Sequence, residues 1–206
     1  MGCDIHQIVE VFNGASWDLA PDAPVIEWRS YDAFAILAGV RNGAGFAGSD
    51  TGDGFVPVSS PRGLPADLSS ATLAIVQKDG DEWLGEHSFS WLLLTELLDY
   101  NWNQRTNLRG VVNATEFREF LETGSPSGWR SDVYGRLVHY VSPDEMARLI
   151  GSGESTSHVY TRIQWSVSYK EAAPCLHAEY IPSLCAWAQR RCLRPEHVRM
   201  VFGFDS

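Results

Sequence analysis

The chain has 206 residues, of which 44% are hydrophobic and 20% are charged. These values are typical of a globular protein with a substantial core, and because no stretch has the composition of a flexible linker we expect one domain over residues 1–206. The formal net charge of −10 argues against duplex nucleic acid as a partner, because duplex binders present basic faces. Neither a long apolar run nor a signal peptide is present, so we expect no membrane partner and a cytoplasmic location.

The N-terminal residues predict a β-hairpin. Residues 4–12 are rich in β-branched side chains and end at Asn13-Gly14, a pair that favours a type I′ turn, so a partner strand should follow over residues 16–19. Because side chains alternate along a strand, Asp4 and His6 share one face of the first strand. We expect the Asp4 carboxylate to orient the His6 ring and to stabilise its protonated form.

A short helix and a long loop follow the hairpin. The helix is predicted over residues 31–40, with Ser30 as its N-cap and Gly39 as its end. Residues 39–65 carry seven glycines and three prolines, which leave little room for regular structure. The apolar residues of this stretch argue against disorder, so we interpret it as a packed loop. Its glycines let backbone N–H groups approach a ligand that carries phosphate or several hydroxyls.

The rest of the chain alternates between helices and strands. Helices are predicted over 67–78 and 94–100, from the cap formed by Asn113 and Glu116 to Gly124, and from Ser142 to Gly151. A further helical region over 171–191 contains Pro174 and Pro182, which should start, kink or split it. Strands are predicted over 136–141, 158–169 and 198–204. Strands at both ends with helices between them predict an α+β fold on a mostly antiparallel sheet.

No motif in the chain specifies a cofactor. Gly43-x-Gly45-x-x-Gly48 has the letters of a dinucleotide-binding fingerprint, but it lacks a strand before it and a helix after it. Residues 50–54 resemble part of a calcium loop without the spacing of an EF-hand. The four cysteines, Cys3, Cys175, Cys185 and Cys192, lack the spacing of a zinc site, and we expect them to be reduced and structural.

The candidate site residues come from the first strand, the glycine-rich loop and the segment around His87. The candidate catalytic residues are Asp4, His6 and His87, and the candidate ligand-binding residues are Arg41, Asn42, Arg62, Trp83 and Trp91. Histidine and aspartate transfer protons, arginine binds phosphate through two donors, and tryptophan stacks on nucleobases. Ordinary structural roles for the histidines and core packing for the tryptophans remain open. A metal centre that recruits Asp50, Asp53 or Glu86 also remains open, with no metal ligand assigned.

Four segments of the chain resemble a group of hypothetical proteins of tailed bacteriophages and prophages. They are the opening MGCDIH, the block from YDAFAILAGVRNG to PRGLP, the segment GEHSFSW and the closing VRMVFGFD. The resemblance covers both ends and the middle of the chain and implies an infected bacterial host, but it supplies no chemistry. In the related pattern the middle segment is DGHSHSW, whereas this chain has Glu86 in place of its glycine and Phe89 in place of its second histidine.

In a phage setting these residues predict a protein that recognises a small phosphorylated nucleotide, for example a host immune signal, and hydrolyses it as a phosphodiesterase would. The alternatives are a non-catalytic nucleotide sponge that counteracts host defence, a metal-dependent hydrolase, and a structural or partner-binding phage protein. The expected partner is therefore a small nucleotide ligand, and formation of a homo-oligomer is a further expectation.

Overall fold

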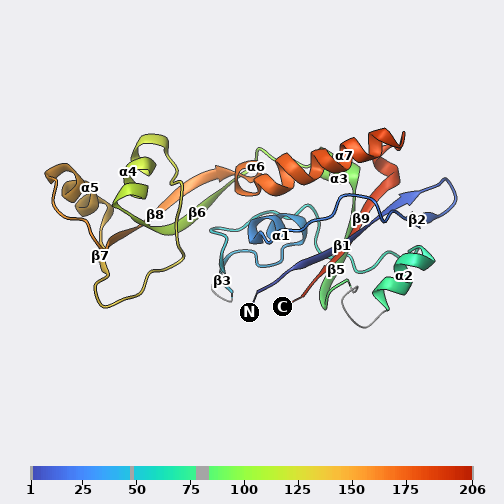
Figure 1. Cartoon of the computed structure of the whole chain (residues 1–206), viewed down its shortest axis with the longest axis horizontal. Helices are drawn as coiled ribbons and strands as arrows, with labels where there is room; N and C mark the ends of the chain where they lie inside the picture. Colours follow the sequence, from blue (N-terminus) through green and yellow to red (C-terminus); the bar gives the residue numbers. More distant parts are fainter. Residues whose placement is uncertain (1, 47–48, 78–83, 206) are drawn as a thin grey trace. The chain divides into compact units, whose positions relative to one another are not determined.

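The computed structural model describes residues 2–46, 49–77 and 84–205. The chain divides into two compact units, coloured by sequence in Figure 1. Unit 1 comprises Met1–Asn42, Phe55–Gln104 and Tyr169–Ser206, and unit 2 comprises Gly43–Gly54 and Arg105–Ser168. Helices accompany sheets in which antiparallel pairs predominate, which confirms the predicted α+β class. The single domain stays a prediction.

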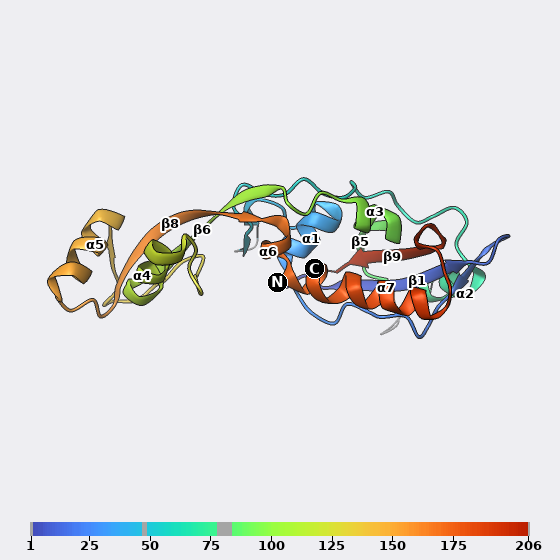
Figure 2. The same ribbon diagram turned by 90° about the horizontal axis from the view of Figure 1, so that it is seen from above.

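Unit 1 is built on a four-stranded sheet in the order β2-β1-β9-β5. Its strands are β2 (Trp17–Leu19), β1 (Ile5–Phe12), β9 (Val198–Phe204) and β5 (His87–Leu93), and each neighbouring pair is antiparallel. The C-terminal strand β9 lies between β1 and β5, and all of its residues are buried. The two chain ends therefore lie close together, as both views show (Figures 1 and 2).

Helices pack against one face of this sheet. They are α1 (Tyr31–Ala38), α3 (Leu94–Asp99), the π-helical segment η1 (Cys175–Tyr180) and α7 (Ile181–Arg190), which follows η1 directly. The short helix α6 (Tyr169–Ala172) contacts α1 and η1. The Phe34 ring of α1 meets the Phe204 ring of β9 edge-on at 5.2 Å between centroids. The buried Tyr180 hydroxyl donates to Gln7 Oε1 of β1 at 2.8 Å. These contacts place the apolar core between the sheet and the helices.

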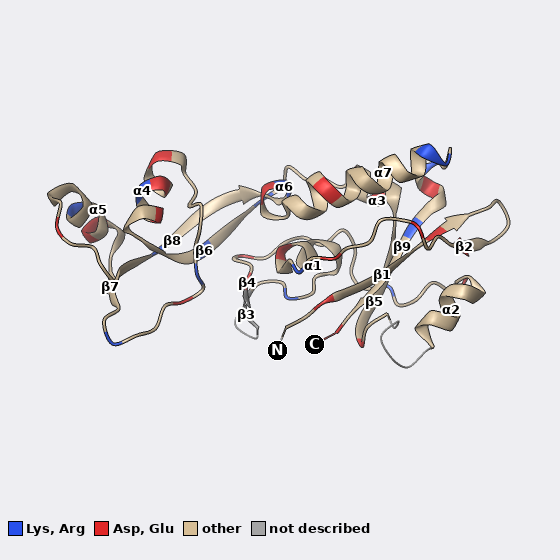
Figure 3. Ribbon diagram, in the orientation of Figure 1, with Lys and Arg blue, Asp and Glu red and all other residues tan. Residues whose placement is uncertain are grey.

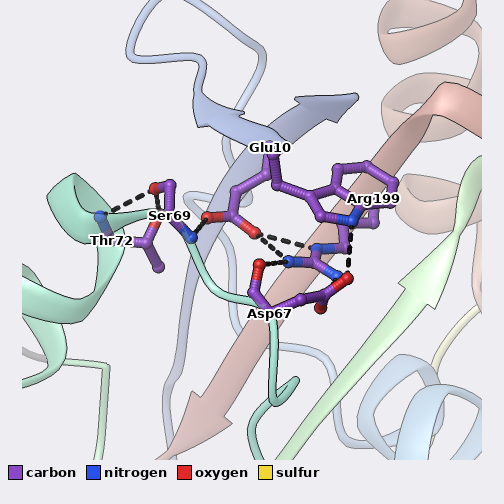
Figure 4. Close-up of polar contacts among 6 residues, drawn as sticks. Glu10, Asp67, Ser69, Thr72 and Arg199 are labelled. Carbon is purple, nitrogen blue, oxygen red and sulfur yellow. Dashed lines mark hydrogen bonds and ion pairs between the residues drawn. The ribbon is translucent and has the colours of Figure 1, made fainter. Parts of the chain in front are cut away.

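The opposite face of the sheet carries a buried ion pair between Glu10 of β1 and Arg199 of β9. Their side chains are 0% and 3% exposed, and Arg199 Nη2 lies 2.7 Å from Glu10 Oε2. Arg199 Nη1 also binds Asp67 Oδ1 at 2.7 Å, and the Ser69 N–H donates to Glu10 Oε1 (Figure 4). Because residues 67–69 make these contacts and Ser69 is the N-cap, helix α2 spans Ser70–Val76 and starts later than predicted.

Unit 2 contains a three-stranded sheet in the order β6-β8-β7. Strand β6 (Arg105–Asn113) is antiparallel to β8 (Val159–Ser168), whereas β7 (His139–Val141) is parallel to β8. Helices α4 (Ala114–Thr123) and α5 (Pro143–Ser152) contact β8 and each other. The short strands β3 (Ala44–Phe46) and β4 (Ser49–Asp50) form a separate antiparallel pair.

The unit 2 sheet has one buried face and one open face. Along β8 the buried residues Thr161, Ile163 and Trp165 alternate with exposed residues, which are Arg162, Gln164 and Ser166. On β6 the exposed residues include Arg105 and Arg109, and the register places these five exposed residues on the same open face.

Gly52 allows the loop of unit 2 to approach β6 closely. Its φ is +65°, and a Cβ at this position would lie 1.9 Å from the Asn107 carbonyl oxygen, which accepts the N–H of Asp53. Alanine at position 52 must therefore adopt a left-handed backbone and displace the main chain of β6.

We expect Gly52→Ala to destabilise unit 2 by clearly more than the ~1–2 kcal/mol that the left-handed conformation alone costs. Gly124→Ala is the matched control, because Gly124 has φ +83° but open space around its Cβ position. Urea unfolding of the two variants measures the difference, and equal losses of stability would contradict the close approach at Gly52.

Many predicted boundaries are confirmed and a few are wrong. Ser30 and Asn113 cap their helices as predicted, while Gly39 and Gly124 end them in left-handed conformations. The type I′ turn is wrong: φ is positive at Gly14 but not at Asn13, and the hairpin loop extends over residues 13–16. The Asn13 side chain accepts the N–H groups of residues 15 and 16 and so stabilises this longer loop.

Two further elements differ from the predicted ones. Helix α5 passes through Gly151 and ends at Gly153, which has φ +72°. Strand β7 is shorter than the strand predicted over 136–141 because residues before His139 form a turn. Strands β3, β4, β5 and β6 have no predicted counterpart, and the first two lie within the predicted loop over residues 39–65. Within the described residues, no helix combines the length and apolar character that crossing a membrane requires.

Candidate functional site

The start of β1 and the end of β9 bring His6 and Asp205 together. The register of β1 and β9 pairs His6 with Gly203, and Asp205 follows Gly203 by two residues. His6 Nε2 lies 3.0 Å from Asp205 Oδ2, and each side chain is 29% exposed. The N–H of Asp4 donates to Asp205 Oδ1 at 2.7 Å, which fixes the second oxygen of the carboxylate. The result is a histidine that is held by a carboxylate and remains accessible to solvent.

Asp4 lies next to this pair, but its carboxylate is bound to Arg29. Arg29 Nε donates to Asp4 Oδ1 at 2.7 Å and Arg29 Nη2 donates to Oδ2 at 2.5 Å. These bonds lower the pKa of Asp4 below its usual value, and the nearby His6 adds a smaller lowering effect. We expected Asp4 to orient His6, whereas the carboxylate hydrogen-bonded to the ring nitrogen Nε2 belongs to Asp205.

A surface groove of about 420 Å³ lies beside Asp4 and Arg29. Its lining consists of Asp4, Ile5, Ile26, Glu27, Trp28 and Arg29. The Arg29 side chain is 48% exposed, so its guanidinium can be reached from solvent. Trp28 is half-buried in the same lining and supplies an aromatic surface. Figure 3 shows acidic positions near both chain ends, where β1 begins and β9 ends.

Arg41 lies in the interior, next to Cys3. Only 9% of Arg41 is exposed, its φ is +57°, and its guanidinium carbon lies 5.7 Å from the centre of the Tyr31 ring. Cys3 is fully buried, and this burial raises the pKa of its thiol even though Arg41 lowers it in part. A buried neutral thiol agrees with the structural role expected for Cys3. Phosphate binding by Arg41 stays a prediction.

His87 has different surroundings from His6. It pairs with Phe204 on β9, and its ring stacks on the Phe204 ring with centroids 6.1 Å apart. Because Phe204 is the neighbour of Gly203 and successive side chains of a strand point to opposite faces, His87 and His6 lie on opposite faces of the sheet. His87 Nδ1 lies 2.9 Å from Ser88 Oγ. The structure therefore does not join the two histidines in one acid–base pair.

Asn42 closes the base of the glycine-rich loop. Its side-chain amide donates to the Phe55 carbonyl at 2.7 Å, and its Oδ1 accepts the Phe55 N–H at 2.7 Å. These two bonds satisfy both backbone groups of Phe55 and hold together the two ends of segment 43–54. The contacts assign Asn42 a structural role, and ligand binding by this residue stays a prediction.

Arg62 and Trp91 contact each other on unit 1. The Arg62 guanidinium carbon lies 4.8 Å from the centre of the Trp91 ring, and both Nη atoms bind the Glu96 carboxylate, at 3.0 and 2.5 Å. Burial alone would raise the pKa of Glu96, but hydrogen bonds from Arg62 and from the N–H of Leu93 lower it below its usual value. A phosphate on Arg62 must compete with Glu96. Trp83 lies outside the described residues.

The aspartates of the glycine-rich loop have protein partners. Asp50 Oδ1 accepts the N–H of Gly52 at 2.8 Å, and the Asp53 carboxylate accepts from Asn107 Nδ2 at 2.9 Å and from Arg109 Nη2 at 2.7 Å. Within residues 2–46, 49–77 and 84–205, no group of three or more His, Cys, Asp or Glu side chains is arranged to hold a metal ion.

Of the predicted site residues, the structure brings together Asp4 and His6, and separately Arg62 and Trp91. It adds Asp205, Arg29 and Trp28, which no motif in the sequence indicates. The only signal for Asp205 is its position after a terminal strand that could pair with the first strand. Comparison with protein-family models, with curated proteins and with solved structures finds no match to this chain.

Proposed function

We propose that this protein binds a small phosphorylated nucleotide where β1 begins and β9 ends, and that His6 acts in its hydrolysis. The observation that carries the proposal is the contact between His6 Nε2 and Asp205 Oδ2 at 3.0 Å, with both side chains 29% exposed. A carboxylate that orients an accessible imidazole is the arrangement that general acid–base catalysis uses in many enzymes.

The tautomer of His6 defines its role. Because a carboxylate accepts from Nε2, the neutral ring carries its proton on Nε2 and its basic lone pair on Nδ1. In the proposed reaction the imidazole takes a proton from water while the water oxygen bonds to phosphorus. The phosphoester P–O bond then breaks, and the leaving oxygen takes a proton from the imidazolium. Asp205 holds the ring in place and stabilises its positive charge.

The neighbouring groove supports a nucleotide as the ligand. Arg29 presents a half-exposed guanidinium that can bind two phosphate oxygens, and Trp28 offers a face on which a base can stack. The bidentate ion pair with Asp4 keeps Arg29 in position before a ligand arrives. A volume of about 420 Å³ lies within the range of small-molecule sites.

The test is a panel of mono-, di- and cyclic nucleotides and ADP-ribose derivatives, screened by thermal shift. A bound nucleotide should raise the melting temperature, because ligand at about 100 times its Kd stabilises the folded state by about 2.7 kcal/mol. Incubation with each stabilising nucleotide, denaturation and chromatography of the released material then identify the reaction. Cleaved product supports hydrolysis, and intact nucleotide identifies a sponge. Absence of stabilisation by every nucleotide in the panel contradicts the proposal.

A further inference from the structure

Unit 2 contains a groove of about 300 Å³ on the open face of its sheet. Its lining consists of Asp50, Arg109, Gly110, Ser131, Arg162, Ile163 and Gln164. From this groove we infer a second ligand site, separate from the one around His6, that binds a phosphate group. Figure 3 shows basic positions along both β6 and β8.

The strand register brings the polar side chains of the groove together. Arg109 of β6 is directly opposite Gln164 of β8, so their side chains point to the same face. Arg162 lies two residues before Gln164 on β8 and therefore shares that face. A one-residue change of register would direct Arg109 away from Arg162, so the fold itself produces this pair of arginines.

Carboxylates hold both guanidinium groups in position. Arg109 Nη2 binds Asp53 Oδ1 at 2.7 Å and Arg109 Nε lies 3.8 Å from Asp50 Oδ1, while Arg162 Nη2 binds Asp132 Oδ1 at 3.0 Å. Arg162 also lies over the Tyr140 ring, at 5.3 Å from its centre. A guanidinium has five N–H donors in a planar fork, and a bond through Nη2 leaves donors on its other nitrogens. The two side chains are 46% and 62% exposed, so a ligand can reach them.

The donors of the lining fit an oxyanion. Arg109 and Arg162 line the groove together with Asp50, and they also bind Asp53 and Asp132, so a phosphate would bind the guanidinium donors that these carboxylates leave rather than an excess of positive charge. The Gln164 amide and the Ser131 hydroxyl add neutral donors for further oxygens. Arginine binds phosphate through paired hydrogen bonds, and the groove has the volume of a small-ligand site. The phosphate is carried by a small phosphomonoester or by the backbone of a single nucleic-acid strand.

Titration followed by ¹⁵N NMR of the arginine side chains tests the site. The probes are inorganic phosphate, adenosine 5′-monophosphate and a short oligothymidylate, each added to the full chain at low ionic strength. We expect the Nε–H signals of Arg109 and Arg162 to shift and saturate together. Arg109→Gln and Arg162→Gln should each weaken binding at this site about tenfold, which corresponds to about 1.4 kcal/mol.

Arg148→Gln is the matched control, because Arg148 is also a half-exposed, ion-paired arginine of unit 2 but does not line the groove. It should leave the affinity unchanged, and circular dichroism should show that all three variants are folded. Saturation by phosphate and the mononucleotide supports a small ligand, whereas saturation by the oligothymidylate alone supports a nucleic-acid strand. The inference is overturned if no probe shifts these signals, or if the two groove variants bind as tightly as Arg148→Gln.

Discussion

Replacement of Arg199 by methionine is expected to destabilise the protein by about 3–5 kcal/mol, which is the usual cost of removing one partner of a buried ion pair. Arg199 and Glu10 are 2% and 0% exposed, so water cannot replace the lost cation. The variant leaves the Glu10 carboxylate buried with the Ser69 N–H as its remaining hydrogen-bond donor. It also removes two bonds that hold Asp67 against the sheet. Urea unfolding measures the loss.

Two controls separate burial from charge. Arg148→Met removes exposed ion pairs with Glu145 and Glu154 and should destabilise the protein much less than Arg199→Met does. The double variant Glu10→Leu with Arg199→Met removes both buried charges, and it should be more stable than Arg199→Met alone because no isolated charge remains. If Arg199→Met is as mild as Arg148→Met, the buried pair is not a major determinant of stability.

Local signals in the sequence predict the ends of several helices well. Ser30 and Asn113 act as N-caps because their side chains accept backbone N–H groups of the first helical turn. Gly39 and Gly124 end helices because each adopts a positive φ at little cost. Gly151 shows the limit of this signal, since a glycine can also continue a helix when Gly153 follows as the cap.

Strands β5 and β6 could not be predicted because their stability comes from distant partners. Strand β6 includes Gly110, which weakens a strand when it is considered alone. In the fold, a Cβ on Gly110 would lie only 2.8 Å from the Trp129 ring, so the glycine makes room for that side chain. Strand β5 pairs with β9, more than a hundred residues later in the chain, through a register shift between His87 and Ser90.

In the candidate site, too, the arrangement within one strand could be predicted, whereas contacts between segments far apart in the sequence could not. The shared face of Asp4 and His6 follows from alternation along one strand. Their partners do not, because Arg29 lies beyond the hairpin and Asp205 lies at the far end of the chain. Both terminal strands were predicted, and their antiparallel pairing in the structure places Asp205 beside the start of β1.

Replacement of His6 by alanine is expected to reduce nucleotide turnover by about 10²–10⁴-fold, the range that general acid–base catalysis contributes. The fold should change little, because His6 is 29% exposed and its hydrogen bond with Asp205 is accessible to water. His139→Ala is the matched control, since His139 is an exposed histidine of unit 2. It should retain wild-type turnover, and the melting temperatures of both variants should stay within a few degrees of the wild type.

The measurement that tests this account most directly is the analysis of nucleotide recovered after incubation with wild-type, His6→Ala and His139→Ala protein. A nucleotide that stabilises all three proteins is incubated with each, the protein is denatured, and the released material is separated by chromatography. We predict cleaved product from the wild type and from His139→Ala, and intact nucleotide from His6→Ala. Cleavage at the wild-type rate by stably folded His6→Ala would contradict a catalytic role for the first strand.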